Sequence, residues 1–69
     1  MDPNANLTEQ EQLLRQLQAK AAAGRSERTL RAMQRQLSEY RQALYDWLRD
    51  GGFEPDWSRA PEARKYYGR

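Results

Sequence analysis

The stretch Leu30–Leu48, LRAMQRQLSEYRQALYDWL, decides the fold of this 69-residue chain. Its apolar side chains recur at alternating intervals of three and four residues, at Leu30, Met33, Leu37, Tyr40, Leu44 and Trp47. This heptad spacing lines them up on one face of an α-helix and is typical of coiled coils and helix bundles. The stretch therefore predicts an amphipathic helix from about residue 27 to about residue 50, with Ser26 as its N-cap.

A shorter amphipathic segment precedes this helix. Thr8-Glu9-Gln10-Glu11 matches the capping box, and Gly24 is a natural stop, so a helix is expected over about residues 8–23. The connection is so short that the two helices should fold back as an antiparallel hairpin. Counting outward from the turn pairs Ala21 with Leu30, Leu17 with Met33, Leu14 with Leu37 and Leu7 with Leu44, and places Tyr40 opposite Gln10 and Glu11.

The two ends of the chain complete the predicted fold. Residues 1–6 are polar and are expected to be a flexible lead-in. The glycines of Asp50–Phe53 predict the end of the long helix, after which residues 53–69 should form a lid and a basic tail. Residues at about 60–67 form either a short third helix or a frayed end. The fold class predicted is all-α, an antiparallel two-helix hairpin with a C-terminal lid.

Composition restricts the chemistry of this single small domain, which spans residues 1–69. Charged residues make up 32% of the chain and the net charge is +2, as in strongly solvated helical proteins. Cysteine and histidine are both absent, which removes disulfides, ordinary zinc ligands and the commonest general base. The sequence also has no phosphate-cradling glycine loop. We expect no enzyme activity, no cofactor and no metal site.

The hydropathy pattern bears on location. No apolar run approaches the roughly 20 residues that span a bilayer. The polar N-terminus lacks the basic start and apolar core of a secretory signal. We therefore expect no membrane partner and a cytoplasmic location.

The first functional hypothesis is a protein–protein interaction module. The long helix extends past the first, so its last turns should stay open apart from cover by Phe53 and Trp57. A second copy could bury this surface and form a homodimer, because aromatic side chains are enriched in such contacts. The predicted interface consists of Tyr40, Leu44, Trp47, Leu48, Phe53 and Trp57. The alternative interpretation is that the stripe is only the core of the hairpin.

The arginines support a second hypothesis. Arg28, Arg31 and Arg35 lie roughly opposite the apolar stripe, with Arg25 just before them at the turn. Such a row can neutralise phosphates, as a small nucleic-acid-binding regulator would. The same row could be a solvated face, partly neutralised by a pair between Arg35 and Glu39. A minor virion or assembly component is a third candidate function.

The basic tail also combines cations with aromatic rings, at Arg59, Arg64, Lys65, Tyr66, Tyr67 and Arg69. Rings among cations can stack on the bases of a single strand. Nearby carboxylates offset part of the charge, so a docking tail or a packing lid is the other interpretation.

Two short stretches resemble a known group of proteins. The opening MDPNANL, residues 1–7, and WLRDGGFEPDW, residues 47–57, are similar to small orphan proteins encoded by actinobacterial phages. In that group a helix ends in a Trp-Leu pair, followed by Gly-Gly-Phe, a proline and a tryptophan. The resemblance implies a compact helical protein of phage origin in a host bacterial cytoplasm, and it implies no activity.

Overall fold

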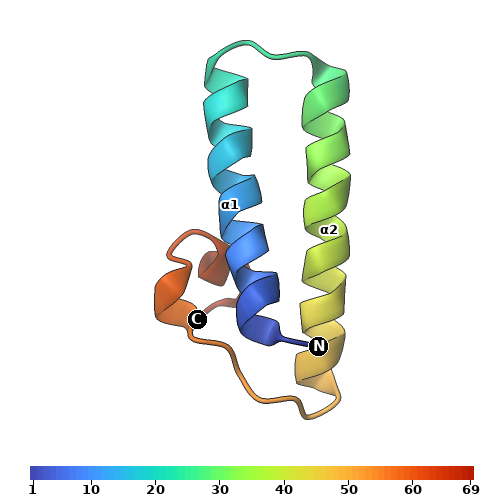
Figure 1. The fold of residues 1–69 in the computed structure, drawn as a ribbon, viewed down its shortest axis with the longest axis vertical. Coiled ribbons are helices and arrows are strands. Elements are labelled where there is room, and N and C mark those ends of the chain that lie inside the picture. The colour runs from blue at the N-terminus through green and yellow to red at the C-terminus, as the bar shows by residue number, and fades with distance from the viewer.

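The computed structural model describes all residues 1–69 and shows an antiparallel helical hairpin with a C-terminal segment packed against one side (Figure 1). The hairpin consists of α1 (Pro3–Ala22) and α2 (Glu27–Arg49). The C-terminal segment contains two short 3-10 helices, η1 (Trp57–Arg59) and η2 (Ala63–Tyr67). The prediction of an all-α hairpin with a lid is confirmed. We call residues 53–69 the lid.

The first helix begins at Pro3 instead of at about residue 8. The Asp2 carboxylate is the N-cap and accepts hydrogen bonds from two backbone N–H groups, at 3.0 and 3.2 Å. Pro3 fits the first helical position because the N–H it lacks would have no partner there. Thr8 lies inside the helix, where its hydroxyl donates to the carbonyl of Asn4. The flexible lead-in predicted for residues 1–6 is therefore wrong beyond its first two residues.

Glycines end both long helices, as the sequence predicts. Gly24 and Gly51 have φ angles of 73° and 91°, the left-handed conformation that follows many helix C-termini. After α2, the N–H of Gly52 donates to the Trp47 carbonyl at 2.8 Å and that of Gly51 to the Leu48 carbonyl at 3.2 Å. These are the paired bonds of the Schellman motif, and they fix where the helix stops.

Two apolar clusters hold the helices together. Nearer the turn, Leu13, Met33 and Leu37 are buried, with Leu14, Leu17 and Tyr40 packed around them. Nearer the chain termini, the buried residues are Leu7, Leu44, Ala60 and Ala63. The clusters agree with the predicted pairing of Leu7 with Leu44 and of Leu17 with Met33.

The less covered end of the hairpin is the turn. The sequence predicted the opposite, namely that the last turns of α2 would stay open. Residues 21–29 are all exposed and Leu30 is only half-buried, so the layer expected between Ala21 and Leu30 is thin. At the other end Leu44 is fully buried. The last turns of α2 are covered because α1 starts early and because the lid lies against them.

Candidate functional site

A buried carboxylate attaches the lid to α1. Glu11 is 5% exposed, and its side chain accepts hydrogen bonds from the N–H groups of Ala63 at 2.8 Å and Glu62 at 3.1 Å. Arg15 Nε lies 3.2 Å from the same carboxylate. A buried charge is tolerated only when it is paired and hydrogen-bonded, and these donors meet that requirement. Glu11 thus caps the start of η2 and holds the lid.

A chain of polar side chains crosses the core from α2 to η2. Gln10 Nε2 donates to Asn6 Oδ1 at 2.8 Å and to the Tyr67 hydroxyl at 2.9 Å. Asn6 Nδ2 in turn donates to the Tyr40 carbonyl at 3.1 Å. Burial raises the pKa of the Tyr67 phenol above its ordinary value. The hydrogen bond with Gln10 and the positive charge of Arg41 lower this pKa, but their effect is smaller than that of burial.

Sequence reasoning missed that this polar chain is part of the core. It placed Gln10 opposite Tyr40, but treated Asn6 as part of a loose lead-in. A signal was present, because Asn6, Gln10, Leu13 and Leu17 follow the same alternating spacing of four and three residues along α1. Polar residues on an apolar stripe indicate buried hydrogen bonds when the helix extends that far.

The aromatic interface predicted for a partner is largely used within the chain. Leu44 is fully buried and cannot contact a partner, so that part of the prediction is wrong. The half-buried members are Tyr40, Trp47, Leu48 and Trp57. Phe53 is 62% exposed, and its ring meets Trp47 edge-on with centroids 5.5 Å apart. Only Phe53 presents a large free surface.

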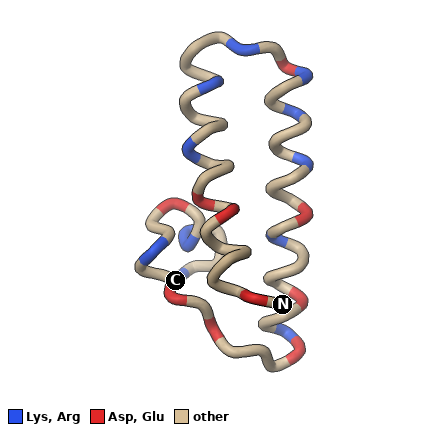
Figure 2. The backbone as a smooth tube through the Cα atoms, in the orientation of Figure 1, with Lys and Arg blue, Asp and Glu red and all other residues tan.

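Charge is separated along the long axis of the molecule (Figure 2). Between residues 15 and 35, at the turn end, six Lys or Arg side chains and one carboxylate give +5. One of these cations, Arg15, is paired with Glu11 just outside this range. Residues 1–14 carry three carboxylates and no cation, hence −3, and residues 36–69 carry six of each sign. Although the net charge of the whole chain is only +2, one end of this molecule, which is about 40 Å long, is strongly basic. Sequence reasoning identified the arginine row but did not recognise that the whole turn end is basic.

The arginine row lies on this basic end. Arg28, Arg31 and Arg35 line one open groove of about 440 Å³, while Arg25 lies outside it at the turn. The expected pair between Arg35 and Glu39 is absent. Arg31 instead lies 3.8 Å from Glu27, and both side chains are largely exposed, so this pair neutralises little. The structure thus brings together three of the four predicted arginines.

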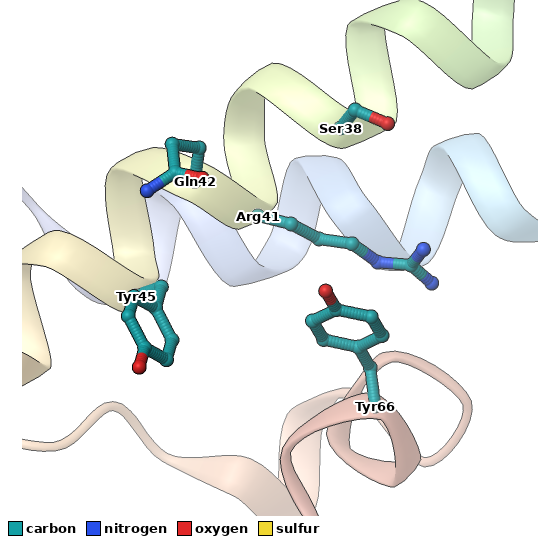
Figure 3. Close-up of a pocket in the computed structure, with 5 residues that line it drawn as sticks. All are labelled: Ser38, Arg41, Gln42, Tyr45 and Tyr66. Carbon is teal, nitrogen blue, oxygen red and sulfur yellow. The ribbon is translucent and has the colours of Figure 1, made fainter.

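Figure 3 shows a second groove, of about 400 Å³, where the lid meets α2. Ser38, Arg41, Gln42 and Tyr45 come from α2, and Tyr66 comes from η2. The guanidinium of Arg41 lies over the ring of Tyr66, 4.1 Å from its centroid, and has no carboxylate within ion-pair distance. Tyr45 and Tyr66 are 55% and 59% exposed. The groove therefore combines an uncompensated cation with two accessible aromatic rings.

Comparisons with protein-family models, with curated proteins and with solved structures give no match. Neither long helix has the length and apolar character needed to cross a membrane. No group of three or more acidic side chains is placed to hold a metal ion.

Proposed function

We propose that the protein is a non-enzymatic interaction module and that its turn end binds the phosphate backbone of a nucleic acid. The proposal rests on the net charge of +5 that residues 15–35 place at the turn end of the hairpin. A basic surface gains affinity by releasing the counterions that surround phosphates. The phage origin and the cytoplasmic location stay predictions.

The spacing of the arginines fits this partner. Arg28 and Arg35 are seven residues apart on one helix face, a rise of about 10 Å at 1.5 Å per residue. Successive phosphates of one duplex strand advance about 3.4 Å along the axis, so the three arginines can contact about three of them. The excess of carboxylates, which is carried by residues 1–14, lies toward the far end of the long axis, away from a backbone bound at the turn.

An aromatic protein–protein interface has less support in the geometry. Its central member, Leu44, is buried, and the lid occupies the surface that a second copy was expected to cover. The exposed ring of Phe53 alone offers a small apolar area, and single exposed apolar residues are normal on soluble proteins.

Fluorescence anisotropy with a labelled 12-base-pair duplex, across a salt series starting at about 50 mM, tests the proposal. The triple variant Arg28→Gln, Arg31→Gln, Arg35→Gln should lose at least tenfold in affinity. The slope of log affinity against log salt should become shallower by about 3, close to one per lost phosphate contact.

The matched control is the triple variant Arg59→Gln, Arg64→Gln, Lys65→Gln, which removes the same charge from the lid. It should bind within about threefold of the wild type, since its positions lie away from the turn. Equal losses in the two variants would show that only net charge matters. No binding by the wild type at the lowest salt, either to the duplex or to its separated strands, would refute the proposal.

A further inference from the structure

The groove in Figure 3 continues the arginine row along α2. Arg28, Arg31, Arg35, Ser38, Gln42 and Tyr45 follow one another at steps of three or four residues, so they share one face of the helix. From the first to the last the face rises about 25 Å. It starts with cations at the turn, passes Ser38 and Gln42, and ends at an exposed ring. The Gln42 amide nitrogen donates to the Asp46 carboxylate at 2.9 Å, so its carbonyl oxygen is the group left free.

Arg41 stands beside the end of this face and is held in place without being neutralised. Its guanidinium stacks on the Tyr66 ring at 4.1 Å, and no carboxylate pairs with it. The neighbouring cations differ, because each is neutralised by carboxylates. Arg49 is paired with Asp46 and Asp50, and Arg69 is paired with Glu54. Stacking on an aromatic face orders an arginine while leaving its charge available to an anion.

Tyr45 supplies a free aromatic surface next to this cation. Its ring is part of both the groove in Figure 3 and an adjoining one of about 530 Å³ along Leu48 and Tyr67. Aromatic rings are the usual platforms for bases of single strands, because every base has a flat face. In a duplex those faces are already stacked and paired, so this contact requires an unpaired base.

We propose that the groove formed by Arg41, Tyr45 and Tyr66 binds an unpaired base and its phosphate, so that α2 as a whole binds a single-stranded nucleic acid. Tyr45 stacks on the base, Arg41 contacts the phosphate, and Tyr66 positions Arg41. The backbone continues along Gln42 and Ser38 to the arginines of the turn end. This inference rests on the proposed function and specifies its ligand as a single strand, of DNA or RNA.

The test is anisotropy with labelled 12-mers of one sequence, as single-stranded DNA, single-stranded RNA and duplex DNA. The wild type should bind at least one of the single strands about tenfold tighter than the duplex, the gain expected from stacking one base. Tyr45→Ala should remove this preference while leaving duplex affinity within about twofold of the wild type. Tyr45→Phe keeps the ring and should retain the preference.

Phe53→Ala is the matched control, because Phe53 is an equally exposed ring outside the groove. It should bind all three ligands as the wild type does. Circular dichroism of each variant should show wild-type helicity, since Tyr45 is on the surface. Tighter binding of the single-stranded RNA than of the single-stranded DNA, or the reverse, would show which of the two nucleic acids the groove prefers.

The outcomes separate this inference from the proposed function. Equal binding of single strands and duplex by the wild type would overturn the inference and leave the proposed function in place. Equal effects of Tyr45→Ala and Phe53→Ala on single-strand affinity would also overturn the inference. Absence of binding to all three ligands would overturn both.

Discussion

At the scale of single residues, polar side chains in the core determine where the lid lies. Glu11 is a buried anion whose carboxylate binds the first N–H groups of η2, and Gln10 joins the same element through the Tyr67 hydroxyl. Buried polar groups are costly unless every partner is present. These residues therefore favour one docked position of the lid over others that would leave them unsatisfied.

Glu11→Gln should destabilise the protein by about 1.5–3 kcal/mol, the range for hydrogen bonds to a charged group. The amide keeps the shape of the side chain but removes its charge. Urea unfolding measures the loss, and amide hydrogen exchange should speed up at Glu62 and Ala63. Glu9→Gln is the control, because Glu9 is exposed on the same helix and should change stability by less than about 0.5 kcal/mol. Equal effects would contradict the assigned role of Glu11.

Tyr67 should make the stability sensitive to alkaline pH. Burial raises the pKa of its phenol in the folded state, so the folded protein holds this proton more tightly than the unfolded chain. The resulting stability is fully present below the unfolded pKa, near 10, and is lost as pH rises through the raised folded pKa. Urea midpoints measured between about pH 8 and 12 should therefore fall faster for the wild type than for Tyr67→Phe. Parallel curves would exclude this linkage.

At the scale of elements, the lid completes a core that the two long helices cannot close alone. Ala60 and Ala63 are fully buried against Leu7 and Leu44, and their small side chains let the lid backbone approach closely. Trp57 and Tyr67 pack over the same cluster, with ring centroids 5.1 Å apart. The lid is thus part of the folded unit, and the alternative of a frayed basic tail is wrong for most of its length.

Deleting residues 57–69 should lower the thermal midpoint by more than about 12 °C. The deletion exposes Leu7 and Leu44, and uncovering buried leucines costs about 3 kcal/mol or more in total. In a domain of this size each kcal/mol moves the midpoint by about 4–8 °C. Circular dichroism melting measures the shift. Deleting only Gly68 and Arg69 removes an exposed ion pair and should change little.

At the scale of the whole molecule, the separation of charge is the property that bears most on function. The turn ends of two copies, at +5 each, repel one another, while the stripe that could have formed a homodimer is covered within each chain. Repulsion of this kind is strongest at low salt and is screened as salt rises. Both effects favour a single chain as the free form of the protein.

Sedimentation equilibrium at micromolar concentration should therefore give a single species of 8.2 kDa at low salt. Raising the salt separates the two causes, because it screens the charge but does not uncover the apolar stripe. A species of twice this mass at every salt concentration would restore the homodimer hypothesis and would direct attention to the half-buried rings of Tyr40 and Trp47.

The sequence by itself determined the two helices, their antiparallel arrangement and the arginine row. The heptad stripe of Leu30–Leu48, the glycine stops and the short turn are local signals, and short-range geometry is enough to interpret them. The N-terminal boundary was missed because two helix-start signals, Asp2-Pro3 and Thr8-Glu11, compete. Both obey the capping rules, and only the burial of Asn6 and Leu7 favours the earlier one.

Only the tertiary structure decided which end of the hairpin is open and which residues form a groove. The lid contacts α1 across 52 residues of sequence, through Glu11 and Ala63, and it contacts α2 across 25 residues, through Arg41 and Tyr66. Such contacts depend on long-range packing and leave no periodic signal in the chain. The lid covers the core near Leu44, and two candidate surfaces remain exposed: the basic turn end, and the groove further along α2 where the lid meets that helix.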